Sequence, residues 1–325
     1  MIITQTPLRI SFLGGGTDFA DFYREYGGCV LTTAIDKYVY VIVKERFDEA
    51  IVVGYTKKEW VTKVDDLEHE LVREAMKKTG VEKGIEITFL SDVPAAGSGL
   101  GSSSSVTVGT LNALYQYTGR AVDAERLARE ACEIEIEILK KPIGVQDQYI
   151  AAYGGVDFIE FRKDGTIAVE PAGLSGEQLD DLNSHMMVWF TGKTRQAAAV
   201  LKEQKANIPK KNKVLVEMAQ QARVGRRLLM AGRIAALGKL LDEGWRLKKT
   251  LASKVSDGEI DKIYKAAVKA GAYGGKISGA GGGGFLTLLV PSVKREAVRR
   301  AMAGLQEMPV GLSRDGSKVI FNIRK

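Results

Sequence analysis

Strand-like patterns of apolar and β-branched residues occur in the first third of the chain. The first clear one runs from Tyr38 to Val43, after a glycine-studded region from Gly14 to Gly28. A second runs from Ile85 to Leu90 and ends at Ser91-Asp92. The pattern therefore predicts two strands, at Tyr38–Val43 and at Ile85–Leu90.

Helical spacing of apolar residues follows the second strand. After a Gly/Ser loop, this spacing runs from about Ser103 to Tyr117, and Gly119 closes the helix. Another helix is expected after Asp123, whose side chain suits an N-cap. Its buried stripe is predicted to comprise Leu127, Ala131, Ile134 and Ile138.

The second half of the chain is predicted to be richer in helix than the first. Helical patterns dominate from Thr194 to Lys254 and from Glu259 to Ala270. A glycine cluster, Ser278 to Gly284, then leads into further elements. These are a strand at Phe285–Val290, a helix near Val293–Leu305 and a strand at Lys318–Ile323. We therefore expect an α+β protein of two domains, residues 1–180 and 181–325.

Composition narrows the class of protein. The chain has 325 residues, of which 45% are apolar and 27% charged, the balance of a globular protein. No apolar run reaches the roughly 20 residues of a membrane-spanning helix. The first residues lack the charged and apolar regions of a signal peptide. We expect a cytoplasmic enzyme with no membrane partner.

The net charge of +7 raises the question of nucleic acid. The basic residues are spread along the chain, and only Lys210–Lys213 forms a compact run. No basic stretch is interleaved with aromatic residues that could stack on bases. The charge therefore favours an enzyme of small anionic substrates and no nucleic-acid partner.

Cysteine and histidine chemistry is not indicated. Cys29 and Cys132 are far apart and lack the spacing of a zinc site or a disulfide framework, so each is expected to be a small core residue. His69 and His185 are isolated and lie near no nucleophile motif.

The loop after the second predicted strand has the character of an anion site. Residues Gly97 to Ser104 are almost all glycine or serine and open directly into a helix. Glycines let the backbone approach a bulky anion, and the first N–H groups of the helix point towards it. The spacing fits neither the Walker A loop nor the dinucleotide fingerprint. A flexible loop with a serine N-cap is the alternative interpretation.

Three motifs in order resemble the GHMP kinases, the family of galactokinase, homoserine kinase, mevalonate kinase and phosphomevalonate kinase. They are Gly97–Ser103 after Pro94, Arg9–Phe19 and Lys276–Phe285. Four residues separate Pro94 from Gly99 where the family usually has three. The resemblance spans the whole chain. It implies a ribosomal S5-like α+β N-terminal domain, a ferredoxin-like α+β C-terminal domain and an active site in the cleft between them.

The resemblance also implies roles for individual residues. Asp147 matches the aspartate that faces the acceptor hydroxyl, and Arg9 matches the arginine beside it. Ser103 and Glu135 match residues near Mg²⁺, although Glu133 and Glu137 are close rivals of Glu135. The residues implied to hold the phosphates of ATP are Gly97, Ser98, Gly99, Leu100, Gly101, Ser102, Ser103 and Ser104.

One difference from the galactokinase motif concerns the sugar that accepts the phosphoryl group. Galactokinases have Gly-Glu-His-Thr-Asp where this chain has Gly14 to Asp18, so the glutamate that contacts the hydroxymethyl end of galactose is absent. The chain is here similar to the D-glycero-D-manno-heptose 7-phosphate 1-kinases. Lys193 and Arg195 would then suit the 7-phosphate. The implied substrate-binding residues are Gly14, Gly15, Gly16, Thr17, Asp18, Lys193, Arg195, Gly279, Gly281 and Gly282.

Several alternatives stay open. A fucokinase-like or galactokinase-like anomeric sugar kinase is the nearest. A sensor that binds ATP and sugar without turnover would need a damaged loop or a lost Asp147 or Arg9, and all of these are present. A homodimer is also left open.

Overall fold

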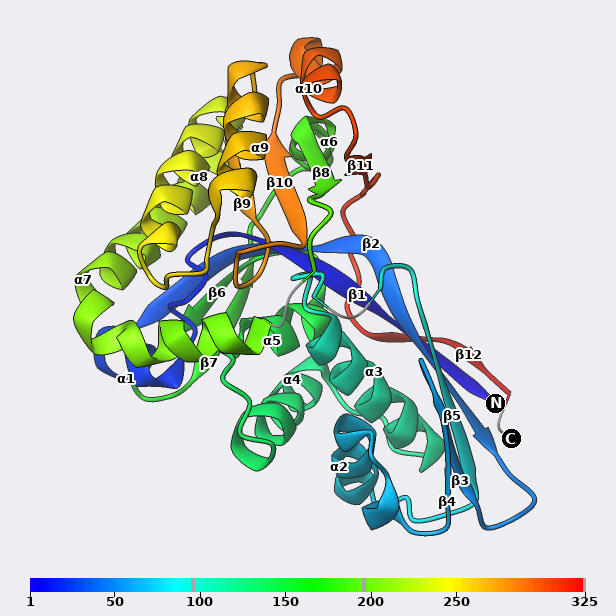
Figure 1. The fold of residues 1–325 in the computed structure, drawn as a ribbon. Coiled ribbons are helices and arrows are strands. Elements are labelled where there is room, and N and C mark those ends of the chain that lie inside the picture. Colours follow the sequence, from blue (N-terminus) through cyan, green and yellow to red (C-terminus); the bar gives the residue numbers. More distant parts are fainter. Residues whose placement is uncertain (95–96, 195–196, 324–325) are drawn as a thin grey trace.

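The computed structural model describes residues 1–94, 97–194 and 197–323. Figure 1 shows strands β1 and β2 crossing the middle of the molecule. Helices α2 to α5 lie on one side of them and a smaller sheet with its own helices on the other. The predicted α+β class is confirmed.

The larger sheet contains eight strands among the described residues, in the order β12-β1-β2-β5-β3-β4, with β6 beside β2 and β7 beside β6. Their bounds are Ile2–Leu13 (β1), Gly28–Glu45 (β2), Ile51–Gly54 (β3), Lys58–Val61 (β4), Ile85–Ser91 (β5), Val156–Phe161 (β6), Ile167–Pro171 (β7) and Lys318–Asn322 (β12). The long β2 pairs with β6 along its first part and with β5 along its last part. The strand predicted at Ile85–Leu90 is confirmed as β5.

The strand predicted at Tyr38–Val43 is confirmed as part of β2, but the structure has more β-structure before it. β1 occupies Ile2–Leu13, and β2 begins ten residues before Tyr38. Pro7 interrupts the alternation that identifies a strand, because proline cannot donate to the ladder. The structure places Pro7 at a bulge, where the register between β1 and β2 shifts.

That bulge re-aims the side chains that follow it. Before the shift, Thr4 and Thr6 face helix α3 (Ser102–Tyr117) near Gly109. After the shift, Arg9 faces the loop at the start of the same helix. The extra residues of this bulge, Asp36 and Lys37, lie on β2 opposite the step from Pro7 to Leu8, and Arg9 follows directly after it.

The smaller sheet is antiparallel, in the order β11-β8-β10-β9. Its strands are Met186–Phe190 (β8), Gly274–Ile277 (β9), Phe285–Leu289 (β10) and Gln306–Glu307 (β11). It has an apolar core of its own, which includes Trp189, Trp245 and Leu286. The strand predicted at Phe285–Val290 is confirmed as β10.

The helices are, besides α3, Ala20–Tyr26 (α1), Glu70–Thr79 (α2), Ala124–Cys132 (α4), Gln146–Tyr153 (α5), Gly176–His185 (α6), Ala197–Met230 (α7), Ile234–Lys249 (α8), Gly258–Lys269 (α9) and Arg295–Ala301 (α10). The predicted helices at α3 and α4 are confirmed, and Asp123 caps α4 by accepting from Arg126 N. The predicted stripe fails only at Ile138, which is 46% exposed. Residues Glu133–Ile138 form a π-helical turn, whose longer hydrogen-bonded repeat shifts the buried face.

The end of the chain returns to the larger sheet. β12 pairs with β1 so that Ile2 lies opposite Asn322, and both termini lie together in Figure 1. The last strand is therefore part of the sheet built by the first residues, and the proposed boundary at residue 180 stays a prediction. No described helix is long and apolar enough to cross a membrane.

Candidate active site

Arg9 and Asp147 form a two-pronged ion pair. Arg9 Nε and Nη2 donate to the two carboxylate oxygens of Asp147 at 2.8 Å and 2.7 Å. Asp147 lies in the first turn of α5, and Arg9 lies on β1 after the bulge. The third arm of the guanidinium donates to Gly99 O at 2.6 Å. One buried arginine thus ties the predicted acceptor aspartate to the predicted phosphate loop.

The loop at Gly97–Gly101 gives α3 an open N-terminus. Gly97, Gly99 and Gly101 all have positive φ, at 73°, 73° and 81°, which suits glycine. Gly101 is the N-cap and supplies no side-chain cap to the helix. The first N–H groups of a sixteen-residue helix are therefore left for another partner, and its dipole favours an anion there.

The serines of this loop divide into two groups. The Ser98 and Ser102 hydroxyls bond to each other at 3.0 Å and are buried, as are Leu100 and Ser104. Ser103 is exposed at the helix start and donates to Glu135 Oε2 at 2.8 Å. Among the predicted hydroxyls, that of Ser103 is the one at the surface of the site.

Glu135 is the acidic residue that faces Ser103. It is fully buried on the π-helical turn, and Gln148 Nε2 donates to its other oxygen at 3.0 Å. Burial raises the pKa of the Glu135 carboxyl. Glu133 instead forms an ion pair with Lys78 on α2, and Glu137 is exposed. The structure thus brings Glu135 next to Ser103, as predicted, and places neither Glu133 nor Glu137 there.

The glycine cluster of the second half packs against the first loop. A Cβ on Gly99 would lie 2.6 Å from Ser278 O, and a Cβ on Gly279 would lie 2.8 Å from Gly99 Cα. A Cβ on Gly284 would meet Ser98 O at 2.4 Å. Gly281 and Gly282 contact Val255 instead. Close backbone approach is the reason for glycine on both sides of this contact.

Gly14 to Asp18 form a buried loop after β1. Asp18 accepts from Gly16 N at 2.9 Å and from Gln146 Nε2 at 2.9 Å, which links the loop to α5. Thr17 holds the loop to β2, because its hydroxyl bonds to both backbone groups of Cys29. A Cβ on Gly14 would lie 2.0 Å from Cys29 O, so close packing against β2 requires glycine at this position. Gly15 and Gly16 have more room.

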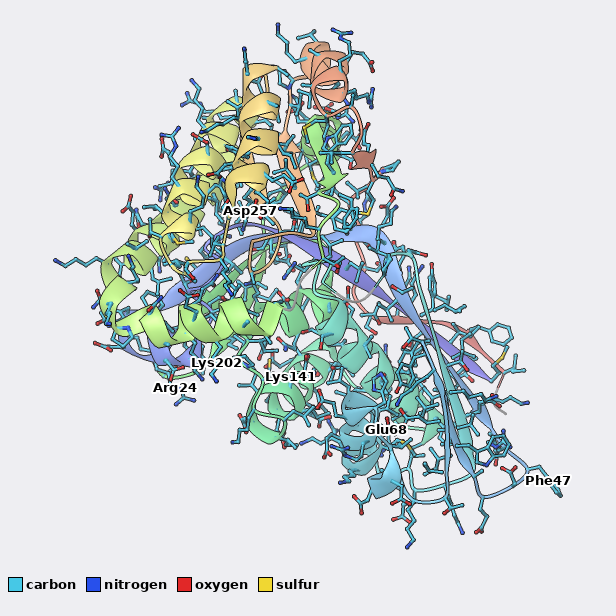
Figure 2. The ribbon with its side chains drawn as sticks, in the orientation of Figure 1. Arg24, Phe47, Glu68, Lys141, Lys202 and Asp257 are labelled. Atoms are coloured by element: carbon cyan, nitrogen blue, oxygen red, sulfur yellow. The ribbon has the colours of Figure 1, made fainter. Side chains whose placement is uncertain are left out.

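Lys193, one of the two predicted basic partners of a sugar phosphate, is less favourably placed. Lys193 forms ion pairs with Asp257 at 2.7 Å and Glu259 at 2.6 Å, which raise its pKa. Asp257 lies at the base of α9 (Figure 2). Arg195 lies outside the described residues. Lys193 therefore already has two carboxylate partners and is not an unpaired charge.

Two lysines that the sequence did not single out do reach the site. Lys248, near the end of α8, donates to Gly15 O at 3.0 Å. Lys276, on β9, donates to Ser11 O at 2.9 Å. Burial lowers the pKa of Lys276 well below its ordinary value, and the charges of Lys248 and Arg9 lower it further. Lys276 stands at the head of the third motif, whereas Lys248 carried no local signal.

A cavity of about 250 Å³ opens beside Ser98. Its apolar lining comes from both halves of the molecule and includes Val93, Pro94, Phe190, Phe285 and Met308. A larger cavity of about 660 Å³ lies elsewhere, around Asp157 and α6, and contains none of the predicted site residues.

Comparison with known proteins gives a consistent result. The models of the GHMP kinases N terminal domain and the GHMP kinases C terminal match residues 67–155 and 226–305. The D-glycero-alpha-D-manno-heptose 7-phosphate kinase of Campylobacter jejuni is 32% identical over 318 residues, 93% of each chain. A crystal structure of a D-glycero-D-manno-heptose 1-phosphate kinase from Bacteriodes thetaiotaomicron has a TM-score of 0.84 at 26% identity, covering 100% of both chains. A putative sugar kinase from C. jejuni has a TM-score of 0.76 at 28% identity, covering 98% of this chain and 97% of that one.

Proposed function

This chain belongs to the GHMP kinases, and we propose that it transfers the γ-phosphate of ATP to the anomeric C1 hydroxyl of D-glycero-D-manno-heptose 7-phosphate. It is an ATP-dependent sugar kinase of heptose metabolism. The observation that carries the reaction type is the Arg9–Asp147 pair beside the open N-terminus of α3.

In this proposal Asp147 accepts a hydrogen bond from the acceptor hydroxyl and orients its oxygen for in-line attack on the γ-phosphorus. Each carboxylate oxygen of Asp147 has a second lone pair besides the one used by Arg9. The Asp147 side chain is 23% exposed, while that of Arg9 is 6% exposed. Asp147 is thus accessible to a substrate. The more buried Arg9 holds the Asp147 carboxylate in place and offsets negative charge on the transferred phosphoryl group.

ATP is expected to bind across the two halves of the molecule. Its phosphates would lie on the N–H groups at the start of α3, where the dipole and the missing side-chain cap both favour an anion. Its adenine would enter the apolar cavity beside Ser98, between Pro94 and Met308. The two subsites meet at Ser98, which lines the cavity and belongs to the loop.

The residues near Ser103 fit Mg²⁺ in their chemistry. Ser103 and Glu135 offer hard oxygen ligands, and no described cluster of three or more His, Cys, Asp or Glu side chains forms a complete metal site. Mg²⁺ commonly takes one or two protein oxygens and completes its shell with substrate phosphates and water. Ser103 and Glu135 would hold the ion, which supplies charge neutralisation at the phosphates.

The choice of acceptor draws on two relatives. One is named a heptose 7-phosphate kinase and the other a heptose 1-phosphate kinase, so both names join heptose with phosphate. Gly15 supports an acceptor with a large or anionic end, because the position carries no acidic side chain to repel it.

The test is ADP release with Mg-ATP and a panel of heptose 7-phosphate, mannose, galactose, fucose and mevalonate. We expect turnover with the heptose phosphate. The product should no longer be a reducing sugar, because phosphorylation of the C1 oxygen blocks the reducing end. Asp147→Asn should lower kcat by about 10²- to 10⁴-fold. Asp164→Asn, in an exposed turn, is the matched control.

Two outcomes would contradict the proposal. Faster turnover of a sugar without phosphate would keep the kinase and reject this acceptor. ATP binding without turnover of any acceptor would instead support a sensor.

A further inference from the structure

Two buried lysines from the second half of the chain meet the Gly14–Asp18 loop and the strand before it. Lys248 is 4% exposed and Lys276 is 6% exposed, and each donates to a main-chain carbonyl of the first half. Within the described residues no carboxylate forms an ion pair with Lys276. Burying an ammonium group is costly unless a partner compensates the charge. For Lys276 a carbonyl offers only part of that compensation, so an anionic ligand would complete it.

Polar groups line the space next to the Gly15 Cα, where a side chain would otherwise stand. The point where a Cβ would stand on Gly15 lies 3.6 Å from Ser11 Oγ, 3.8 Å from Gln146 Nε2 and 3.8 Å from Lys248 Nζ. A hydroxyl, an amide and an ammonium therefore surround one position that no side chain fills. The group that suits all three is one with several oxygen acceptors.

One polar atom at this position has no partner. Ser11 Oγ is buried and forms no hydrogen bond within the described residues. Ser11 is only 3% exposed. A buried hydroxyl without a partner costs free energy, and native structures rarely leave one unexplained. A ligand oxygen at Gly15 would accept from Ser11 Oγ and remove this cost.

The position of these groups relative to Asp147 indicates which part of a substrate they would meet. Arg9 and Ser11 are two residues apart on one face of β1, a separation of about 7 Å. Gln146 is the neighbour of Asp147 on α5. The Gly15 position therefore lies beside the reacting hydroxyl but displaced along β1, where the far end of a bound sugar would lie.

Charge favours a phosphate there. Lys248 and Arg9 both lower the pKa of Lys276, while Asp18 and Asp147 oppose them. The repulsion among these cations would be relieved by a dianion. Lys193, by contrast, already has two carboxylates as partners.

We propose that Lys248 and Lys276, with Ser11 and Gln146, bind the phosphate of the acceptor at Gly15 and so select phosphorylated sugars over free ones. This inference rests on the proposed function. The same donors would also suit a phosphate of ATP, so the experiment has to separate the two sources.

The test compares Lys248→Met with Lys249→Met. Met keeps most of the length of the lysine stem and removes its charge. Lys249 is the next residue of α8 and pairs with Asp261 instead. The measured quantity is the ratio of kcat/KM for heptose 7-phosphate to kcat/KM for the heptose without phosphate. Lys248→Met should lower this ratio by about 10- to 100-fold, the value of a hydrogen bond to a charged group. Lys249→Met should leave it unchanged.

An unchanged ratio in Lys248→Met would overturn the inference. So would a loss confined to the KM for ATP, which would assign the lysine to the nucleotide phosphates. Lys248→Gln is a second variant that removes the charge but keeps a polar side chain in the buried position. Circular dichroism and thermal unfolding identify a variant that has not folded.

A second measurement separates this inference from the proposed function. Inorganic phosphate is added to the protein saturated with Mg²⁺ and a non-hydrolysable ATP analogue, and thermal unfolding is followed. Phosphate should stabilise the wild type and Lys249→Met but not Lys248→Met. If heptose 7-phosphate is not turned over while this difference persists, the proposed function fails and the phosphate site stands. Equal stabilisation of all three proteins would reject the site itself.

Discussion

The contact between the two glycine loops can be tested with a pair of matched substitutions. Gly99 and Gly119 have almost the same positive φ, +73° and +72°. A Cβ on Gly99 would lie 2.6 Å from Ser278 O, whereas a Cβ on Gly119 would meet nothing within 4 Å. Alanine is strained by the positive φ at both positions, and only Gly99→Ala adds a clash between the halves of the molecule.

The magnitudes follow from that geometry. Alanine in the left-handed region costs about 1 kcal/mol, so Gly119→Ala should lower the free energy of unfolding by about that amount. Gly99→Ala should lower it further. To reach the ordinary contact distance of 3.4 Å, Ser278 O and the new Cβ must separate by about 0.8 Å. The clash would shift the phosphate loop, to which Gly99 belongs. A displacement of about 1 Å between this loop and Asp147 costs about 10²-fold in rate.

Two assays are needed, denaturant unfolding and steady-state ADP release with varied ATP. We expect Gly119→Ala to keep the wild-type kcat/KM for ATP and Gly99→Ala to lose about two orders of magnitude. If the two variants agree in both assays, the close approach of Gly99 to Ser278 is not part of the working enzyme and the reasoning is refuted.

Three further predictions concern single side chains. Glu135→Gln should raise the Mg²⁺ concentration for half-maximal rate, measured by Mg²⁺ titration at fixed ATP; an unchanged midpoint would remove Glu135 from the metal site. Thr194→Trp, at an exposed position lining the cavity beside Ser98, should raise the KM for ATP and leave the KM for sugar alone; the reverse pattern would contradict adenine binding there. Burial raises the pKa of Asp157 from 3.8 to about 7, so the folded state loses stability as pH rises through that window. Asp157→Asn should therefore melt above the wild type at pH 8, with a gap that closes towards pH 4, and a gap independent of pH would contradict this.

Local chemistry of the sequence determined a large part of this protein. The phosphate loop was found because Gly97 to Ser104 sit between a strand and a helix, and glycines at positive φ with an uncapped helix start are local requirements. Helices α3 and α4 and strand β5 were predictable for the same reason: their periodicity and end signals lie within each element. Arg9 and Asp147 were identified by their motifs, and their pairing was implied by the family resemblance.

Only the tertiary structure decided how these parts meet. Arg9 faces the start of α3 just after the register shift between β1 and β2, and the π-helical turn selects Glu135 over its neighbours. Lys248 lies 233 residues from the carbonyl it contacts, so no window of sequence could relate the two. Lys193 was a reasonable phosphate ligand until its two carboxylate partners were seen. Backbone conformation and burial periodicity are local properties that a sequence carries in short stretches. The partner of a buried charge depends on the packing of elements far apart in the chain, and that is fixed only when the whole molecule folds.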